Sequence, residues 1–282
     1  MSKITKQQLK QHEEAEQLLW GSDRRLKRDE VEFCLTHWDP RADSGRHVAR
    51  NQAYFTPMAL ACEAAMYVGG NGRRVVDICA GTGRLAYAVL AANGWQPQAV
   101  QVTAVEFNPE YVRVGQRLLP EVEWVLGDCY DLSLWQSLPR FDKAISNPPF
   151  GAVVTEHDTD WIGYRGPAGL TVAAIGLQVA RLGIKMILPQ TQTVFRYSGA
   201  DPRYGAHADS YPGYLKKFMA QRPDLEWDHT SLDTEAEAYK SEWRGAAPIV
   251  EVVSLYDPEA ALLPLLTEPT ISRPICSLGV MG

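Results

Sequence analysis

Arg74-Val75-Val76-Asp77-Ile78-Cys79-Ala80-Gly81-Thr82-Gly83-Arg84-Leu85 is the stretch of this sequence that decides the fold. Its first half, Arg74 to Cys79, is an apolar run that predicts a buried β-strand. The glycines that follow predict a tight turn, and a helix is expected from Arg84 to Ala92. The turn lacks the third glycine of a dinucleotide fingerprint and the Lys-Ser/Thr of a P-loop. Both a ligand-binding loop and a simple strand-to-helix turn remain open at this point.

Strands and helices continue to alternate after this unit. Further strands are expected at 100–106, 123–128, 141–146 and 184–188, and helices at 109–119 and 168–182. Strands separated by helices predict a parallel sheet that is covered by helices on both faces. Two late strands are expected at 225–232 and 248–255.

The N-terminal part has a different composition. Residues 3–35 are polar, charged and free of proline, which predicts one or two helices, and 36–53 has the composition of a loop. A helix is expected to begin after Pro57, to run to Met66 and to end at Gly69-Gly70, with proline before it and glycine after it.

The segment between Gln190 and Asp224 is dominated by Pro, Gly, Tyr and Asp, which predicts a long loop or a small insertion. We therefore divide the chain into a helical extension at 1–50, one α/β domain at 51–260 with a loop insertion near 190–224, and a tail at 261–282.

Composition excludes several classes of protein. The 282 residues are 45% apolar and 22% charged, which is ordinary for a globular protein and excludes wholesale disorder. There is no apolar run of about 18 residues, so we expect no membrane span. The first residues, Met1 to Gln7, lack the apolar core of a signal peptide, which predicts a cytoplasmic protein.

Charge gives mixed indications about nucleic acid. The net charge of −6 does not favour phosphate binding, although a local basic face is sufficient for it. The densest basic run is Arg24-Arg25-Leu26-Lys27-Arg28, and Arg41, Arg46, His47 and Arg50 follow it. Acidic residues are interleaved with this run, so a solvated helical face and a DNA-binding patch both remain open.

The five cysteines are Cys34, Cys62, Cys79, Cys129 and Cys276. They are scattered, odd in number and form no C-x-x-C pair, so neither a zinc site nor a disulfide framework is indicated. Buried, reduced thiols are expected.

Acidic residues follow two of the predicted strands. Glu106 ends the strand at 100–106 and is placed to accept both hydroxyls of a ribose. Capping the next helix is a role better assigned to Asn108. Asp128 ends the following strand and could accept a hydrogen bond from the exocyclic amine of an adenine. Ligands of open α/β sheets bind at the carboxyl ends of the strands, where all these residues are expected.

Asn147-Pro148-Pro149-Phe150 ends the fourth strand and is the most specific motif of the chain. Its tandem prolines remove backbone donors and stiffen the turn. The amide oxygen of Asn147 and the carbonyl of Pro148 could then both accept hydrogen bonds from one NH₂ group. That would hold the amine and raise the electron density on its nitrogen as it attacks a methyl sulfonium. Phe150 offers a flat face to a planar base.

These motifs together resemble the amino-group class of S-adenosylmethionine-dependent methyltransferases, which carry Asn-Pro-Pro-Tyr/Phe. Upstream, Tyr54-Phe55-Thr56-Pro57 is similar to the Phe-x-Thr-Pro element of adenine-N6 DNA methyltransferases. The resemblance covers roughly residues 50–190. It implies a Rossmann-like class I methyltransferase fold, whose seven-stranded, mostly parallel sheet has helices on both faces and a reversed last hairpin.

The resemblance also implies S-adenosylmethionine as the cofactor, with Thr56 and Pro57 at its methionine part, Glu106 at the ribose and Asp128 at the adenine. The full set of predicted cofactor-binding residues is Tyr54, Phe55, Thr56, Pro57, Asp77, Ala80, Gly81, Thr82, Gly83, Glu106, Phe107, Asn108, Asp128, Cys129 and Asn147. The predicted catalytic residues are Asn147, Pro148, Pro149 and Phe150. The resemblance requires no covalent cysteine intermediate, and we see no metal site among the histidines.

Adenine N6 in DNA is the acceptor that the upstream element implies, and DNA is the expected partner. Only 190–224 and the first 50 residues are available for target recognition. The former mixes aromatic and basic residues: Arg196, Tyr197, Arg203, Tyr204, Tyr211, Tyr214, Lys216, Lys217 and Arg222. So small a region is compatible with low sequence specificity, a specificity partner, or a substrate other than duplex DNA. A homodimer also remains open.

Three alternatives stay open. RNA guanine-N2 and protein glutamine-N5 methyltransferases share the Asn147–Phe150 motif, and the Tyr54–Pro57 element argues against both. The third alternative is a non-catalytic S-adenosylmethionine-binding partner protein. An intact Asn147 and an intact glycine loop argue against that reading.

Overall fold

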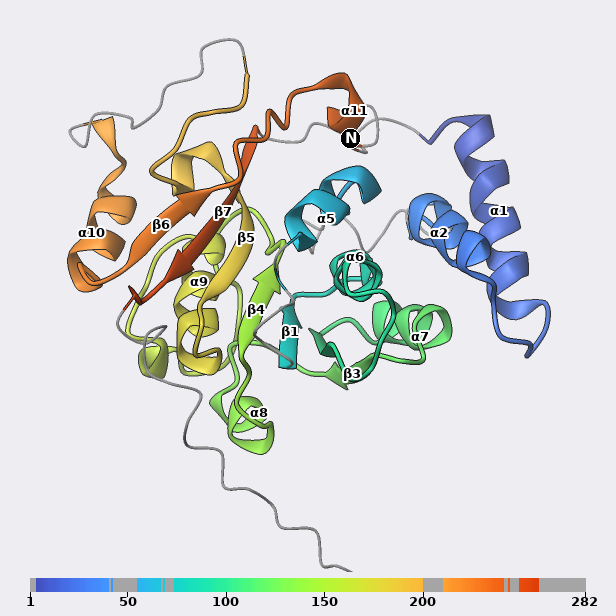
Figure 1. Cartoon of the computed structure of the whole chain (residues 1–282), viewed down its shortest axis with the longest axis horizontal. Helices are drawn as coiled ribbons and strands as arrows, with labels where there is room; N and C mark the ends of the chain where they lie inside the picture. The colour runs from blue at the N-terminus through green and yellow to red at the C-terminus, as the bar shows by residue number, and fades with distance from the viewer. Residues whose placement is uncertain are drawn as a thin grey trace, which may run out of the picture.

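A seven-stranded sheet forms the centre of the molecule (Figure 1). The computed structural model describes residues 4–40, 42, 55–66, 68, 74–199, 210–240, 243 and 249–258. The strands are β1 Arg74–Ile78, β2 Gln101–Glu106, β3 Glu123–Leu126, β4 Lys143–Ser146, β5 Ile184–Pro189, β6 Glu226–His229 and β7 Val250–Tyr256.

The strands follow the order β3-β2-β1-β4-β5-β7-β6 across the sheet. All neighbouring pairs are parallel except those of β7, which runs antiparallel to both β5 and β6. The predicted parallel sheet with a reversed last hairpin is therefore confirmed. The order of the strands reverses direction between β1 and β4, and such a switch point opens a crevice at the carboxyl ends of the strands.

Two apolar cores lie on opposite faces of this sheet, because successive side chains of a strand point to opposite faces. Val75 and Ile145 pack into one core and their neighbours Val76 and Ala144 into the other. In β7, Val252 and Val253 divide in the same way. Apolar residues therefore run continuously along the central strands, as expected of a sheet that is buried on both faces.

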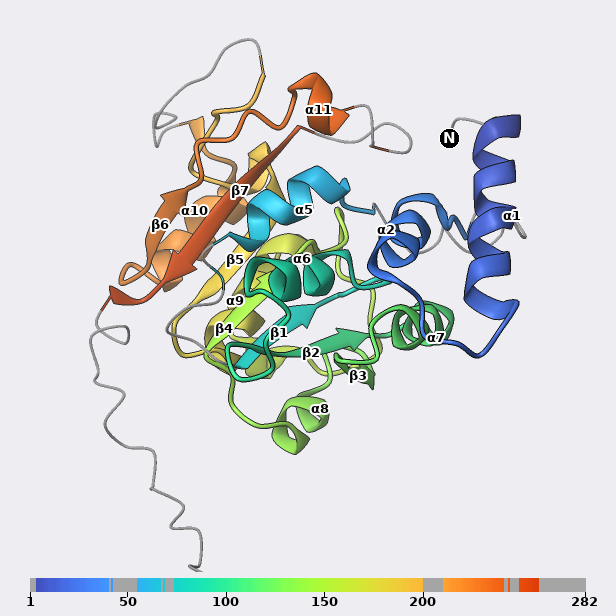
Figure 2. The same ribbon diagram turned by 45° about the vertical axis from the view of Figure 1, so that its right-hand side comes forward.

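Helices cover both faces (Figures 1 and 2). The helices are α1 Lys6–Trp20, α2 Arg28–His37, α5 Met58–Ala65, α6 Arg84–Ala92, α7 Pro109–Leu118, α8 Leu132–Ser137, α9 Ala168–Val179, α10 Gly213–Gln221 and α11 Glu237–Lys240. Short 3₁₀ turns lie at Asp160–Ile162 and Gln190–Gln192. Residues of α5, α6 and α7 belong to the first core, and residues of α8, α9 and α10 to the second.

The two N-terminal helices, α1 and α2, pack outside α7 (Figure 2). Leu19 of α1 and Leu35 of α2 are buried in the first core. The indole of Trp38, just after α2, meets the ring of Tyr111 edge to face, with 6.0 Å between the ring centroids. Arg117 of α7 donates to the carbonyl of Leu19 at 2.8 Å. The predicted N-terminal helices are thus present and share the core of the α/β sheet.

The expectation of a loop between Gln190 and Asp224 is wrong in one part, since Gly213–Gln221 forms the helix α10. Leu215 and Phe218 are one turn apart and buried in the second core. Tyr214 and Met219 pack beside them and widen this apolar stripe, and Pro212 precedes the helix as Pro57 precedes α5. The Pro- and Gly-rich composition of the whole segment outweighed this short signal in the sequence. Among the residues described, no helix is both long and apolar enough to cross a membrane.

Gly115 of α7 gives a test of the packing in the first core. A Cβ added there would lie 2.1 Å from Cη2 of Trp124, whose indole nitrogen donates to the carbonyl of Leu119 at 3.2 Å. We expect Gly115→Ala to destabilise the protein by ~1–3 kcal/mol through overpacking, although alanine favours helices. Urea unfolding measures the change. Gly213→Ala is the control because a Cβ at Gly213 meets nothing within 4 Å. Equal effects of the two substitutions would contradict the packing argument.

Candidate functional site

Two loops leave the sheet side by side at its switch point. Ile78 of β1 pairs with Ser146 of β4, and the hydroxyl of Ser146 donates to the carbonyl of Ile78 at 2.6 Å. The next residues are Cys79, which begins the glycine loop, and Asn147, which begins the proline turn. The two motifs that the sequence singles out are therefore neighbours in the structure.

The glycine loop is a tight turn that opens α6. Gly81 and Gly83 have φ values of 58° and 94°, in the left-handed region that favours glycine. The amide of Gly83 donates to the carbonyl of Ala80 at 2.9 Å, which closes the turn. A Cβ at Gly83 would lie 2.9 Å from Cδ1 of Leu119, so both the conformation and the space require glycine there.

Asp77 supports the glycine loop through a hydrogen bond to the start of α6. Its side chain is fully buried, and Oδ2 accepts a hydrogen bond from the amide of Ala86 at 3.0 Å. Its Oδ1 has no hydrogen-bond partner in the part of the chain that the structure describes. Burial raises the pKa of Asp77 well above its usual range. The residue fixes the first turn of α6 under the loop.

Glu106, at the end of β2, is joined to the same loop. Its Oε2 accepts from the amide of Gly81 at 2.8 Å and its Oε1 from the amide of Asn108 at 2.9 Å. Burial raises the pKa of Glu106 to about 7. Asn108 caps α7, since its side chain accepts from the amide of Glu110 at 2.9 Å, as expected. Phe107 between them is 57% exposed, so one flat aromatic face is available beside the carboxylate.

Asp128, after β3, is bonded on both oxygens. Oδ1 accepts from the amide of Tyr130 at 3.0 Å, and Oδ2 accepts from the hydroxyl of Thr155 at 2.9 Å. Thr155 belongs to the loop that follows the proline turn. Asp128 therefore links the ends of β3 and β4. The next residue, Cys129, has its sulfur 3.8 Å from the sulfur of Cys79.

Asn147 is held by a residue of the upstream element. Its Nδ2 donates to Oγ1 of Thr56 at 2.8 Å. Because the amide nitrogen makes this bond, the amide oxygen is directed away from Thr56. Pro148 is buried, and Phe150 is half-buried against the first core. Thr56, predicted to contact the cofactor, and Asn147, predicted to hold the amine, are thus direct neighbours.

Arg84 is a site residue that the sequence analysis missed. Its Nη1 donates to the carbonyl of Thr56 at 2.7 Å, and its guanidinium lies 5.2 Å from the centroid of the Phe55 ring. The Phe55 ring in turn lies 3.6 Å from where a Cβ of Gly81 would be. A cation in the first turn of a helix is unfavourable with respect to the helix dipole, and that was the available signal. Arg84 therefore anchors the Phe55–Thr56 segment over the glycine loop.

Of the remaining predicted site residues, Pro57 and Thr82 are buried beside Thr56 and Gly83, and Pro149 is half-buried in the proline turn. Tyr54 lies outside the described residues, as do Arg41, Arg46, His47 and Arg50.

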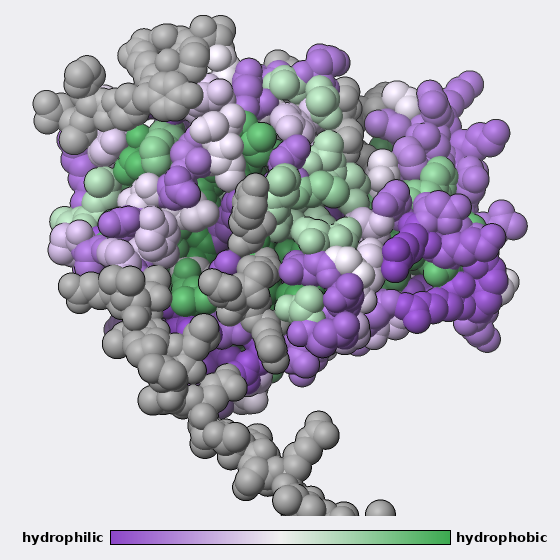
Figure 3. Space-filling model, viewed as in Figure 1, coloured by the Kyte–Doolittle hydropathy of each residue, from purple (hydrophilic) through white to green (hydrophobic). Residues whose placement is uncertain are grey.

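The basic run at Arg24–Arg28 is engaged within the chain. Arg24 bonds the carboxylate of Glu30, Arg25 pairs with Glu121, and Arg28 lies 4.9 Å from the centroid of the Trp95 indole. Of the two possibilities left open for this run, a helical face does not apply to most of it, because only Arg28 lies in a helix and the rest connects α1 and α2. The surface around these two helices is largely hydrophilic, and apolar side chains are visible near α5 and α6 (Figure 3).

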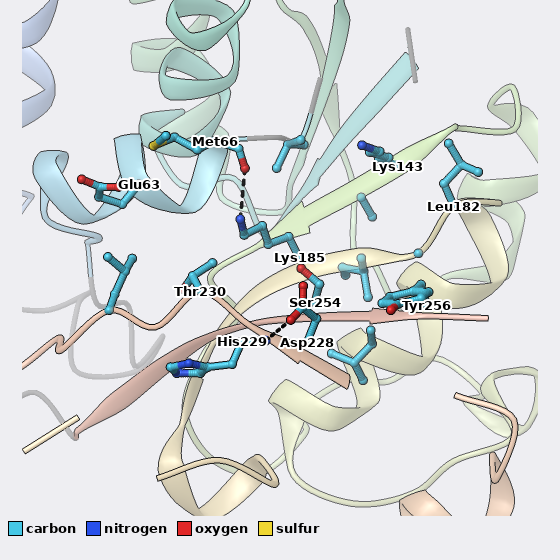
Figure 4. Close-up of a pocket in the computed structure, with 16 residues that line it drawn as sticks. Glu63, Met66, Lys143, Leu182, Lys185, Asp228, His229, Thr230, Ser254 and Tyr256 are labelled. Atoms are coloured by element: carbon cyan, nitrogen blue, oxygen red, sulfur yellow. Dashed lines mark hydrogen bonds between the residues drawn. The ribbon is translucent and has the colours of Figure 1, made fainter. Parts of the chain in front are cut away.

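A hollow of about 640 Å³ lies elsewhere, on the α5 side of the sheet (Figure 4). Lys185 of β5 crosses it and donates to the carbonyl of Met66 at 3.0 Å, with Asp228 of β6 on the opposite side. None of the predicted site residues lines this hollow. It lies toward the amino ends of β4 and β5, whereas open α/β sheets bind ligands at the carboxyl ends. We therefore take the switch point as the candidate functional site.

The sequence matches no protein-family model, and no curated protein sequence is similar to it. Solved structures share its fold. A type I restriction–modification methyltransferase subunit from Streptococcus thermophilus is 15% identical, with a TM-score of 0.53 over 81% of this chain and 48% of its own. A modification subunit assigned to a type I restriction enzyme of Vibrio vulnificus is 12% identical, with a TM-score of 0.52 over 83% of this chain and 50% of its own.

A third structure, assigned as a class I S-adenosylmethionine-dependent methyltransferase of Listeria monocytogenes, is 10% identical. Its TM-score is 0.50 over 92% of this chain and 81% of its own. The present chain spans about half the length of the two restriction–modification subunits. The fold is that of the class I methyltransferases, as the sequence predicted.

Proposed function

We propose that this protein transfers a methyl group from S-adenosylmethionine to an exocyclic amino nitrogen, and that the acceptor is adenine N6 in DNA. The observation that carries the proposal is the carboxamide of Asn147. It is fixed through Thr56 at the carboxyl end of β4, directly beside the glycine loop at the end of β1. A hydrogen-bond acceptor held beside a nucleoside-binding loop is the arrangement that amine methylation needs.

The residues at the switch point fit this cofactor. Glu106 is a carboxylate at the tip of the strand after the glycine loop, where it can accept ribose hydroxyls. The exposed ring of Phe107 can stack on an adenine, and Asp128 can accept from the adenine amine. The glycines leave room for close approach of the loop backbone. When bound, S-adenosylmethionine supplies an electrophilic methyl group on its sulfonium.

The chain's own residues would then hold the acceptor. The amide oxygen of Asn147 and the carbonyl of Pro148 accept hydrogen bonds from the two protons of an NH₂ group. These bonds orient the amine and increase the electron density on its nitrogen. Phe150 lies in the same turn and supplies an aromatic face for a planar base, which must leave the DNA stack to reach this depth.

Two observations favour DNA as the acceptor. The Phe55-Thr56-Pro57 segment, which resembles the upstream element of adenine-N6 DNA methyltransferases, is bonded to Asn147. Two of the proteins that share the fold are, by their names, parts of restriction–modification systems. Target recognition by a separate specificity subunit is part of this proposal.

Methyl transfer from radiolabelled S-adenosylmethionine tests the proposal. The purified protein is offered unmethylated duplex DNA, single-stranded DNA, RNA and a protein extract. Label in DNA, followed by mass analysis of the nucleosides that identifies N6-methyladenine, is the expected result. Label in RNA or protein alone would assign a guanine-N2 or glutamine-N5 acceptor. Cofactor binding without any transfer would favour a non-catalytic partner protein.

The pH dependence of cofactor binding tests the role of Glu106. Only the ionised carboxylate can accept both ribose hydroxyls, and burial raises the pKa of Glu106 to about 7 in the free protein. Binding therefore favours the deprotonated form, and affinity falls as the pH drops below about 7. Between pH 8 and pH 6 we expect it to weaken by up to about tenfold.

Titration calorimetry at pH 6, 7 and 8 measures this dependence. Glu106→Gln is the matched control, because its side chain does not titrate while the ligand's own titration contributes to both measurements. The same pH profile in both proteins would contradict the assigned role.

A further inference from the structure

Two cysteines meet beside the glycine loop. Cys79 directly follows β1 and Cys129 lies just after β3, with β2 between these strands. The two residues are 50 positions apart in the sequence, yet their sulfur atoms are 3.8 Å apart. Cys79 is half-buried and Cys129 is buried. The proposed function uses neither thiol chemically.

The sulfur contact places the two thiols within reach of a disulfide. A disulfide bond is about 2.05 Å long, so its formation needs the two sulfurs to approach by somewhat less than ~2 Å. No other residue separates the two sulfurs, because they form a direct sulfur–sulfur contact. Cys79 also has a φ of 62°, in the left-handed region where glycine is favoured. The loop thus holds a thiol at a position where a glycine would fit more easily.

The Cys79 thiol is expected to react slowly in the resting protein. The hydrogen bond with Cys129 and burial raise the pKa of the Cys79 thiol well above its ordinary range. Because the thiolate is the reacting species, we expect oxidation to be faster at alkaline pH.

We propose that Cys79 and Cys129 are an oxidative modification site, at which peroxide forms an intramolecular disulfide that weakens cofactor binding. One thiolate attacks hydrogen peroxide and breaks its O–O bond, which gives a sulfenic acid and releases hydroxide. The second thiol then displaces the sulfenic hydroxyl as water and forms the S–S bond. In total, two thiols and one peroxide give one disulfide and two waters. The sulfurs are oxidised and the peroxide is reduced.

The expected effect on cofactor binding follows from the two loops that the disulfide would connect. Cys79 precedes Ala80 and Gly81, whose amide is bonded to Glu106. Cys129 follows Asp128, the residue assigned to the adenine. A disulfide would bring the loops on either side of Glu106 closer together. It would thereby narrow the space in which the nucleoside part of the cofactor is proposed to bind. This part of the inference rests on the proposed function, whereas formation of the disulfide does not.

The experiment treats the full-length protein with hydrogen peroxide and measures its intact mass under denaturing, non-reducing conditions. A loss of about 2 Da, reversed by dithiothreitol, is expected, with a faster reaction at pH 9 than at pH 7. Peptide mapping should join the Cys79 and Cys129 peptides. The loss should vanish in Cys79→Gly, which suits the left-handed backbone, and in Cys129→Ser. It should persist in the Cys34→Ser/Cys62→Ser control.

Titration calorimetry with S-adenosylmethionine then compares the reduced, oxidised and re-reduced protein. The oxidised form should bind at least about tenfold more weakly, and dithiothreitol should restore the affinity. Absence of the 2 Da loss, or its persistence in Cys79→Gly, would overturn the modification site. Unchanged affinity after oxidation would overturn its effect on binding. A disulfide that forms in a protein whose reduced state binds no cofactor would instead refute the proposed function.

Discussion

Replacing Asn147 with alanine is expected to lower the rate of methyl transfer by roughly 10²–10³-fold, the cost typical of losing one preorganised polar group at a reaction centre. The alanine variant retains only the backbone carbonyl of Pro148 as an acceptor for the amine protons. Affinity for S-adenosylmethionine should change by less than about threefold, because the groups assigned to the nucleoside lie on β1, β2 and β3. Single-turnover transfer and titration calorimetry measure the two effects separately.

Asn93→Ala is the matched control for this substitution. Asn93 caps the far end of α6, where its Nδ2 donates to the carbonyl of Val89 at 2.8 Å. Its loss should leave both transfer and cofactor binding unchanged. Full turnover in Asn147→Ala would refute the assigned role. An equal loss of cofactor affinity would indicate instead that Asn147 belongs to the nucleoside site.

Replacing Glu106 with alanine is expected to weaken S-adenosylmethionine binding by about 10²-fold or more. Hydrogen bonds to a charged acceptor are each worth roughly 1.5–3 kcal/mol, and the carboxylate is assigned two of them. The substitution also removes the acceptor of the Gly81 amide, so the glycine loop loses a contact that fixes its shape. Titration calorimetry gives the dissociation constants, with thermal unfolding to confirm that the variant is folded.

Glu14→Ala serves as the control for Glu106→Ala. Glu14 is an exposed carboxylate on α1 and lies outside the site, so its removal changes the charge by the same amount. Binding should be unaffected. Comparable weakening in both variants would point to an electrostatic effect of net charge. Wild-type affinity in Glu106→Ala would exclude the ribose role.

Local patterns were sufficient for most of the fold. The helix expected from Arg84 to Ala92 is α6, because glycine turns and apolar periodicity define it locally. The reversed hairpin came from the resemblance, since nothing local in 248–255 distinguishes an antiparallel strand. Helix α10 was missed because its apolar stripe, Leu215 and Phe218 with the partly buried Tyr214 and Met219, is short and lies in a segment rich in Pro and Gly. Packing against the second core stabilises this helix, which the local sequence predicts only weakly.

The predicted site residues gather in one place for a topological reason. Gly81, Glu106, Asp128 and Asn147 each lie at or just beyond the end of a parallel strand, and parallel strands all end at one edge of the sheet. Contacts between those ends could not be predicted, because they join distant segments. The bond between Thr56 and Asn147 spans 91 positions and the sulfur contact spans 50. Neither leaves a periodic trace in the sequence.

Arg84 restricts the substitutions that the chain can accept around the candidate site. Its guanidinium joins the carbonyl of Thr36, at the end of α2, to the carbonyl of Thr56, and the hydroxyl of Thr56 holds Asn147. These bonds use backbone carbonyls, so they do not by themselves specify the side chain at position 36 or 56. A shorter cation at position 84 would not span both carbonyls. In homologues we therefore expect Arg84 to be kept, and Thr56 and Asn147, which are joined through their side chains, to be kept or exchanged together.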